Sequence, residues 1–324
     1  MDCLQDLRTP IEKELQDFTV LFRESLSHGD GMLNDALSHI CNRGGKMMRP
    51  MLVMLIAKMF GEVNSVTLNG ALGLELLHTA SLVHDDVVDD SDERRGQASV
   101  NALFDNKVSI LVGDYILSTA LYYVAQTHHL DIVSHLAHLG RVLSEGEVKQ
   151  LENIGSDDIS EEAYYVVIRH KTASLFAACA RIGAMSVNAT ESDVLAAESF
   201  GETLGMIFQI RDDIFDYFPS NEVGKPTGND MLEGKLTLPV IHALLQMGDE
   251  DMMRLARAVK AHTITADETK RLVEFTLRSG GIEYAEKKMD MLKRSALDFI
   301  ARCADAQVRH ALEIYLDYVI TRNK

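Results

Sequence analysis

Two groups of aspartates with the same spacing are the residues of this chain best suited to carry out chemistry. Each group follows the pattern Asp-Asp-x-x-Asp and lies in an apolar stretch with helical periodicity, where bare carboxylates are unfavourable. Residues i, i+1 and i+4 of a helix share a face, so each group would direct its oxygen atoms to one side. The six residues are Asp85, Asp86, Asp89, Asp212, Asp213 and Asp216.

This repetition predicts that the chain binds divalent cations. Like charges four residues apart cost roughly 0.2–0.5 kcal/mol per pair on an exposed helix, and burial raises that cost. Oxygen ligands alone suit Mg²⁺, which keeps several waters and often completes its shell with substrate phosphate oxygens.

Basic residues follow the first group of aspartates. Arg94 and Arg95 come just after it, and we expect Gly96 to end the helix. Metal-binding acids combined with arginines suit a diphosphate, which cations and guanidinium groups can hold together. The alternative is a solvated helix end with ordinary salt bridges, but the apolar residues upstream argue against it.

A second basic segment lies nearer the N-terminus, in the sequence GGKMMRP at residues 44–50. Its glycines allow the backbone to approach an anion closely. Lys46 and Arg49 would project from the same side if a helix began here. His78 lies two helical turns before Asp85, where it is either a core histidine or a donor to phosphate.

Further polar residues surround the second group of aspartates. Lys171 and Thr172 interrupt an apolar stretch, although a lysine there could also extend to the surface. Gln209 lies one turn before the second group and shares its face. Lys225 and Lys235 lie in a segment rich in glycine and proline, which is either a plain surface loop or a loop that closes over phosphate.

Composition limits the class of protein. The chain has 324 residues, 46% of them hydrophobic, so it can bury a large core. Its net charge of −17 argues against binding to nucleic acid. The four cysteines form no CxxC pair, and the polar N-terminus is no signal peptide, so we expect a cytoplasmic protein. No apolar run reaches the roughly 18 residues of a membrane span, so no transmembrane segment is predicted.

The periodicity predicts an all-α protein. Only five prolines occur, and none lies between Pro50 and Pro219, where long patterns of period 3.6 dominate. Glycine and proline breaks divide the chain into about ten helices without a linker, so we expect a single domain over residues 1–324.

Taken together, these segments resemble the trans-isoprenyl diphosphate synthases, the polyprenyl synthetase family. Four motifs carry the resemblance over residues 40–240, in the order of the family. They are GGKMMRP, HDDVVDDSDERRG, QIRDDIFD and GKPTGNDMLEGKLTLP. Met47 departs from the family, which often has a basic residue there, and the C-terminal TRNK matches basic tails only in part and receives no role.

The resemblance implies a fold, a cofactor and metal ligands. The fold would be an antiparallel helical bundle around a deep central cavity, usually in a homodimer. Asp85, Asp89 and Asp212 would bind three Mg²⁺ ions that bridge an allylic diphosphate. Asp86, Asp213 and Asp216 would support these ligands. The residues expected to be catalytic are Asp85, Asp86, Asp89, Lys171, Asp212 and Asp213.

The resemblance also implies substrate-binding residues. The allylic diphosphate would be held by Arg94, Lys171, Lys225 and Lys235, with Thr172 and Gln209 beside it. Isopentenyl diphosphate would be bound by Lys46, Arg49, His78 and Arg95.

The implied reaction is chain elongation. Cations neutralise the leaving diphosphate, and an apolar cavity protects the allylic carbocation from water. The double bond of isopentenyl diphosphate attacks the cation, and a proton is lost to the released diphosphate, because the motifs contain no evident side-chain base.

Small residues before Asp85 predict a long-chain product. Ala80 and Ser81 would form the floor under the growing chain, where short-chain relatives carry an aromatic ring. At 1.5 Å per residue, one further turn reaches Leu77 and Leu76, and then Gly73, which we expect to be open.

Several alternatives remain open. Tyr122 or Tyr123, on a helix expected to face this one, could form the eventual floor. The chain could be a shorter-chain farnesyl or geranylgeranyl diphosphate synthase. A class I terpene cyclase would need no isopentenyl diphosphate pocket, and a non-catalytic regulatory subunit would be expected to lose aspartates that this chain retains.

Overall fold

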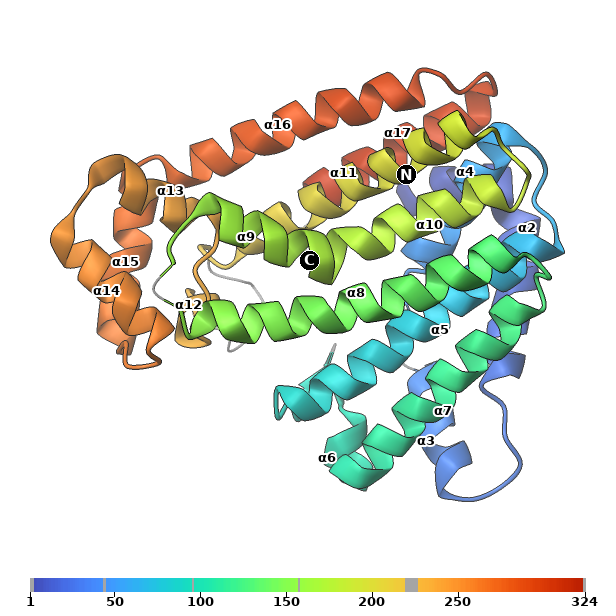
Figure 1. Ribbon diagram of the computed structural model, residues 1–324, viewed down its shortest axis with the longest axis horizontal. Helices are drawn as coiled ribbons and strands as arrows, with labels where there is room; N and C mark the ends of the chain where they lie inside the picture. The colour runs from blue at the N-terminus through green and yellow to red at the C-terminus, as the bar shows by residue number, and fades with distance from the viewer. Residues whose placement is uncertain (1–2, 43–44, 95, 157, 219–226, 323–324) are drawn as a thin grey trace. The chain divides into compact units, whose positions relative to one another are not determined.

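The structure, a computed structural model, describes residues 3–42, 45–94, 96–156, 158–218 and 227–322 (Figure 1). These residues form helices almost throughout, with one antiparallel pair of two-residue strands, which confirms the all-α prediction. The elements are α1 (Cys3–Arg8), a 3₁₀ turn (Thr9–Ile11), α2 (Glu12–Ser25), α3 (Met32–Asn42), α4 (Met48–Phe60), α5 (Ser65–Val88), β1 (Glu93–Arg94), β2 (Gln97–Ala98), α6 (Val100–Phe104), α7 (Asn106–Ala125), α8 (Leu130–Ile154), α9 (Glu161–Ile168), a π-helical turn (Arg169–Ala173), α10 (Ser174–Met185), α11 (Glu191–Phe215), α12 (Asn229–Leu232), α13 (Leu238–Met247), α14 (Glu250–Lys260), α15 (Ala266–Arg278), α16 (Gly281–Ile300) and α17 (Ala306–Thr321).

The chain divides into two compact units. Unit 1 comprises Met1–Gly140, Leu175–Ser199 and Arg302–Ile314. Unit 2 comprises Arg141–Ser174, Phe200–Ala301 and Tyr315–Lys324. The boundaries fall inside α8, α10, α11 and α17, so these four helices contribute residues to both units. The expectation of a single domain stays a prediction.

Unit 1 is built around α4, whose residues from Pro50 to Ala57 are all buried. Such an unbroken apolar stretch is typical of a helix covered on every side. Helix α10 crosses α4 closely, because Gly183 has no side chain. A Cβ at Gly183 would lie 2.5 Å from the Val53 carbonyl oxygen and 3.1 Å from the Ile56 Cβ. This glycine therefore fixes the distance between the two helices.

Helix α5, which carries the first aspartates, begins at a capping box. The Asn64 side chain accepts hydrogen bonds from the backbone of Val66 and Thr67, while the Thr67 hydroxyl accepts one from the Asn64 backbone. Asn64 also donates to the Ser186 carbonyl at 3.0 Å, just past the end of α10. An N-cap of this kind stabilises a helix by about 1 kcal/mol, and here it also fixes the start of α5 relative to α10.

The end of α5 differs from the prediction. The helix ends at Val88, and Asp89 is its C-cap residue. The chain then turns through the β1–β2 hairpin, in which Arg94 pairs with Gln97. Gly96 has a φ of +75° and lies in the hairpin turn, so it does not end the helix as expected. Asp89 therefore lies where α5 gives way to the turn.

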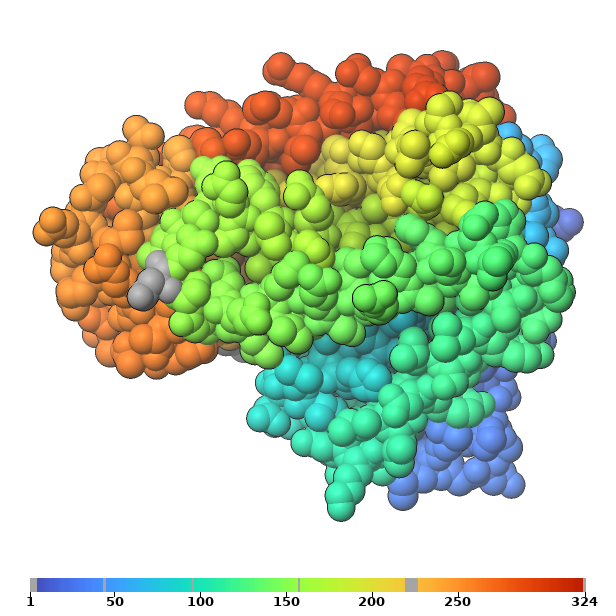
Figure 2. Space-filling model, in the orientation of Figure 1, coloured from blue at the N-terminus to red at the C-terminus, as the bar shows by residue number. Residues whose placement is uncertain are grey.

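Unit 2 contains a helical cluster in which α13 packs on α15 and α16, and α14 packs on α15. Helices α14 and α15 form a continuous orange surface in the space-filling view (Figure 2). Lys260, at the end of α14, donates to the carbonyl oxygens of Asn153, Ser156 and Asp158. Because these carbonyls lie in the last turn of α8 or just after it, a cation stabilises that helix end.

The structure has more helices than the roughly ten expected. Some breaks occur without glycine or proline, as at Asp105, which has a φ of +90° and separates α6 from α7. By length and hydropathy alone, α5 and α7 could each span a membrane, although 56% and 33% of their apolar windows are buried within the protein. The absence of a transmembrane segment stays a prediction.

Candidate active site

The first group of aspartates lies at the end of α5, in unit 1. Asp85 is partly buried and Asp89 is exposed, whereas Asp86 is buried. Arg94 donates from Nε to Asp86 Oδ1 at 2.6 Å, and Asn101 donates to the Asp86 carbonyl. Asp86 thus fixes the hairpin beside the helix end. The structure pairs the predicted diphosphate ligand Arg94 with this buried carboxylate.

The predicted isopentenyl diphosphate residues of unit 1 have different surroundings. Helix α4 begins at Met48, so Lys46 precedes the helix, and the expectation that Lys46 and Arg49 share one helical face is wrong. Met47 has a φ of +53°, which turns the chain away from the helix axis at this point. The Arg49 guanidinium lies 5.4 Å from the centroid of the Phe176 ring.

A small cavity of about 80 Å³ in unit 1 joins two of the predicted basic residues. His78 of α5 and Arg94 of the hairpin both line it, together with Gly45 and Met47 of the GGKMMRP segment. The cavity therefore brings parts of two predicted motifs together with His78. Lys46 and Arg49 are not among its lining residues.

In unit 2, Asp213 is the centre of a hydrogen-bonded network. Tyr164 donates to Asp213 Oδ2 at 2.5 Å, and Gln209 donates to Asp213 Oδ1 at 2.9 Å. Thr172 in turn donates to the Gln209 side-chain oxygen at 2.7 Å. Burial and the charge of nearby Asp230 raise the pKa of Asp213, while the two donors favour its ionised form. The donors therefore offset part of the cost of burying this carboxylate.

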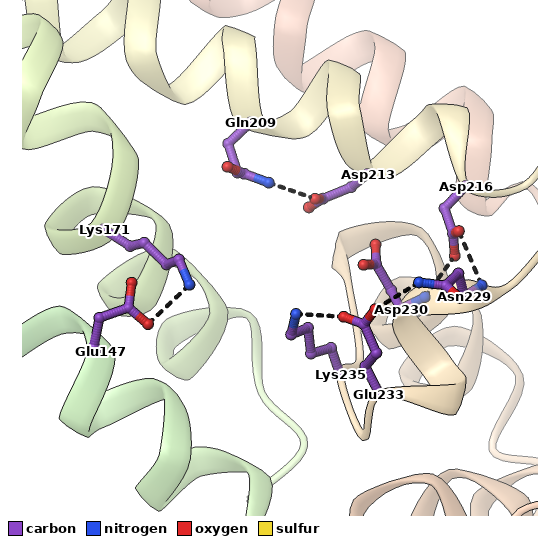
Figure 3. Close-up of polar contacts among 9 residues, drawn as sticks. All are labelled: Glu147, Lys171, Gln209, Asp213, Asp216, Asn229, Asp230, Glu233 and Lys235. Carbon is purple, nitrogen blue, oxygen red and sulfur yellow. Dashed lines mark hydrogen bonds and ion pairs between the residues drawn. The ribbon is translucent and has the colours of Figure 1, made fainter. Parts of the chain in front are cut away.

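Asp216, the last aspartate of the second group, lies one residue past the end of α11. Its carboxylate accepts hydrogen bonds from the backbone of Asn229 at 2.9 Å and Asp230 at 3.2 Å (Figure 3). These are the first residues of α12, whose free N–H groups a carboxylate stabilises. Asp216 thus anchors the start of the segment that carries Lys235.

Two predicted cations of unit 2 are ion-paired. Lys171 lies 2.9 Å from Glu147 of α8, and Lys235 lies 2.7 Å from Glu233 (Figure 3). Lys171 and Thr172 belong to the π-helical turn between α9 and α10. π-Helical turns are rare in proteins, and those that do occur are often found at functional sites. Both lysines would have to exchange a carboxylate for a phosphate in order to bind substrate.

These groups meet at one cavity of unit 2, with a volume of about 150 Å³. Its lining includes four predicted substrate-binding residues together with Asp213. Asp230 also lines the cavity, and its pKa is raised by burial and by the negative charge of Asp216. The five predicted residues are Lys171, Thr172, Gln209, Asp213 and Lys235.

Arg95 and Lys225 lie outside the described residues. The first group of aspartates lies in unit 1, and Asp212, Asp213 and Asp216 of the second group lie in unit 2. Convergence of both groups on one cavity stays a prediction.

The predicted chain-length residues lie along α5. Ala80 is 2% exposed, Ser81 is partly buried, and Leu77 is buried. The expectation that Gly73 is open is wrong, because a Cβ there would lie 3.2 Å from Val124 Cβ and 3.4 Å from the Ala120 carbonyl oxygen. Gly73 serves the close packing of α5 on α7.

Helix α7 does face α5, as expected, but not through both tyrosines. Tyr122 is 62% exposed, so it does not close a path inside unit 1. Tyr123 is partly buried and contacts the Tyr122 ring edge-on, with 5.4 Å between the ring centroids. Val124 and Ala120 are the residues of α7 that meet Gly73.

The predicted metal ligands fit Mg²⁺ by their chemistry. Asp85, Asp89 and Asp212 offer only oxygen atoms, and none of the three is fully buried. Within the described ranges, no group of three or more His, Cys, Asp or Glu side chains is arranged to hold a metal ion by itself. That is compatible with Mg²⁺, which proteins usually bind through one or two carboxylates together with waters and phosphates.

Sequence reasoning missed several residues of the site. Tyr164, Glu147 and Asp230 were not singled out, and neither was Arg322, whose guanidinium contacts Asp212. Asp230 gave a usable signal, because it lies inside the lysine-bearing segment after the second motif. The others carry none, since their partners are far away in the sequence.

Comparison with known proteins gives consistent matches. A model of the polyprenyl synthetase family matches residues 30–276. An octaprenyl diphosphate synthase from Haemophilus influenzae is 37% identical over 287 residues, which cover 88% of this chain and 87% of that protein.

Solved structures also match over almost the whole chain. A geranylgeranyl pyrophosphate synthase from Bacteroides thetaiotaomicron has 48% identity and a TM-score of 0.88, and the match covers 99% of this chain and 100% of that one. A polyprenyl synthase from Caulobacter crescentus, complexed with calcium and isoprenyl diphosphate, has 29% identity and a TM-score of 0.90, with 99% and 98% covered.

Proposed function

The chain belongs to the polyprenyl synthetase family and is a prenyltransferase, and we propose that it condenses isopentenyl diphosphate with an allylic diphosphate. The product would be a long-chain trans-polyprenyl diphosphate, as the name of the Haemophilus relative states for that protein.

One observation carries this proposal. Lys171, Thr172, Gln209 and Lys235 line a single cavity beside Asp213. Two ammonium groups and two neutral polar side chains around a buried carboxylate suit a diphosphate that arrives with its own cations. A purely structural cluster would not need two lysines whose present partners, Glu147 and Glu233, are only partly buried or exposed.

Magnesium would be held by Asp85, Asp89 and Asp212, with three ions in each active site. The all-oxygen donor set supports this assignment, as does the calcium reported with the Caulobacter structure. When bound, Mg²⁺ neutralises negative charge on the leaving diphosphate.

The side chains of this chain would divide the remaining work. Lys171 and Lys235, and in addition Arg94 and Lys225, would bind the allylic diphosphate and orient its leaving oxygen. Lys46, Arg49, His78 and Arg95 would bind isopentenyl diphosphate. Tyr164 and Gln209 hold Asp213 in place. The apolar residues of α5 would keep water from the carbocation.

Product length separates two candidate functions. Ala80 is small and Ser81 is partly buried, which favours a product that extends along α5 beyond the length of geranylgeranyl diphosphate. The closed packing at Gly73, and the buried Leu76 and Leu77, favour an earlier stop and a geranylgeranyl product. The Bacteroides structure carries the name of such an enzyme.

Incubation with farnesyl diphosphate, isopentenyl diphosphate and Mg²⁺ tests both candidates. Chromatography of the products measures chain length directly. We expect products well beyond 20 carbons, a 20-carbon product would establish the second candidate, and a lack of any condensation would refute the proposed activity.

We also propose that the protein is a cytoplasmic homodimer. Ile110, Leu111, Leu121 and Tyr122 are exposed on α7, whose surface is partly visible in Figure 2. Residues 11 apart lie about three turns apart on one helical face, so these four residues form two apolar pairs on the same face of α7, with the exposed Asp114 and Ser118 between them. A second copy is the occupant that the family resemblance favours. The free thiols of Cys41, Cys179 and Cys303 support a reducing compartment.

A further inference from the structure

We propose that Arg322 competes with the divalent cation for Asp212 and thereby sets the metal affinity of the second aspartate group. This inference rests on the proposed function, in which Asp212 is a metal ligand. Arg322 lies immediately after α17, in a segment to which the sequence assigned no role.

The contact is direct. Arg322 donates from Nη2 to Asp212 Oδ1 at 2.5 Å, and from the same nitrogen to the Phe208 carbonyl oxygen at 3.1 Å. The Arg322 side chain is only 10% exposed, whereas that of Asp212 is 39% exposed. The arginine is therefore the enclosed partner, and the carboxylate remains open to solvent on one side.

The guanidinium is held in place by more than its counter-ion. Its Cζ atom lies 3.6 Å from the centroid of the Phe208 ring and 5.8 Å from that of Phe215. Guanidinium groups stack favourably on aromatic faces. Because Phe208, Asp212 and Phe215 all belong to α11, the arginine lies along the helix face that carries Asp212.

Two cations cannot use the same carboxylate oxygen at full strength. The guanidinium occupies Oδ1, and its positive charge repels a second cation at Oδ2. The positive charge of Arg211 also acts on Arg322, so a cation near Asp212 meets repulsion from two guanidinium groups. A bound metal ion would have to displace the guanidinium or accept a weakened ligand. Removal of the charge should therefore tighten metal binding by about tenfold, the equivalent of one charge-assisted hydrogen bond.

The same contact could have the opposite effect on metal binding. If Arg322 instead orients Asp212 through Oδ1 and leaves Oδ2 for the metal, its loss would weaken metal binding. The sign of the change in affinity thus decides between competition and support.

The test uses Arg322→Met in the full-length protein. Methionine retains apolar contact with Phe208 but removes the charge. Free Mn²⁺ is counted by electron paramagnetic resonance during titration, with Mn²⁺ alone and with added inorganic diphosphate, so no turnover is needed. We expect Mn²⁺ to bind Arg322→Met about tenfold more tightly than it binds the wild type. Equal or weaker binding would overturn the proposal.

Two further variants isolate the charge. Arg322→Lys keeps a cation beside Asp212 but loses the planar guanidinium that stacks on Phe208, so it should bind Mn²⁺ less tightly than Arg322→Met. Lys293→Gln removes one cation from the pair with Asp317 of α17, 2.9 Å apart, and should leave the affinity unchanged. If Arg322→Lys or Lys293→Gln tightened binding as much as Arg322→Met, competition at Asp212 would not be the cause.

Asp212→Asn separates this inference from the proposed function. Loss of Mn²⁺ binding in Asp212→Asn supports Asp212 as a ligand, so a failure of Arg322→Met would then count against competition alone. Unchanged binding in Asp212→Asn would refute both the ligand role and the competition.

Discussion

At the scale of single residues, the aspartates of the two motifs differ more in their partners than in their spacing. Asp86 is buried against Arg94, and Asp216 caps α12, so both organise the chain around the site. Asp213 is held by two neutral donors, and Asp212 faces an arginine. A repeated sequence pattern thus supplies carboxylates with separate tasks.

Replacement of Tyr164 by phenylalanine should impair the site through Asp213. The lost hydrogen bond leaves a buried carboxylate with one fewer donor, which costs about 1–3 kcal/mol of stability. Because Asp213 borders the substrate cavity, kcat/KM should fall as well. Thermal unfolding and steady-state kinetics measure the two effects.

The neighbouring Tyr165 supplies the control. Its ring meets that of Tyr164 edge-on, with 5.3 Å between the centroids. Tyr165→Phe should remain close to the wild type in both measurements. Equal losses in the two variants would contradict a specific role of the Tyr164 hydroxyl.

Replacement of Ala80 by phenylalanine should shorten the product by at least one five-carbon unit. Ala80 is buried on α5, so an aromatic ring there would fill the space into which the chain grows. Chromatography of the products with farnesyl diphosphate as primer measures the change, and Ser81→Phe is the companion variant. An unchanged distribution of products in both would refute the floor assignment.

At the scale of elements, small residues set how closely the helices approach. Gly183 lets α10 cross α4, and Gly73 lets α5 pack on α7. The second contact matters for function, because it closes space that the sequence pattern left open. The π-helical turn at Arg169–Ala173 similarly positions Lys171 and Thr172 within an otherwise regular helical run.

Gly183→Ala should destabilise the protein by about 1–3 kcal/mol, because the added methyl group collides with the backbone of Val53. Chemical denaturation measures the free energy of unfolding. Gly140→Ala is the matched control, since a Cβ there makes only an ordinary contact with Leu77, 3.8 Å away. It should be neutral or stabilising, as alanine favours helices. Similar stability of both variants would argue against tight packing at Gly183.

At the scale of the whole molecule, the exposed apolar residues of α7 are the feature that most needs an explanation. Leu111 is 67% exposed and Tyr122 is 62% exposed, although both lie on a helix whose other face packs on α5. Exposed apolar surface of this kind commonly marks an interface.

Leu111→Glu should convert the homodimer into monomers, because a charge would have to be buried against the second copy. Analytical ultracentrifugation measures the molecular mass in solution. Met291→Glu, which changes a similarly exposed residue of α16, should leave the mass unchanged. A wild-type protein that is already monomeric, or a dimeric Leu111→Glu variant, would contradict the proposed interface.

Much of the fold could be predicted because helical periodicity is local. The all-α class follows from spacing within single segments, and most glycine and proline breaks mark real helix ends, such as Gly61 after α4 and Gly248 after α13. The end of α5 was misjudged because Gly96 serves a hairpin turn, which a helical pattern does not reveal.

The sequence by itself determined the residue types of the site, the family resemblance and the helical class, since each depends on neighbours along the chain. Only the tertiary structure decided that Tyr164 holds Asp213, that Arg322 pairs with Asp212, and that Val124 closes the space at Gly73. The physical reason is that each partner comes from a distant segment. Hydrogen bonds and van der Waals contacts form between residues that folding brings together, and no local period records them.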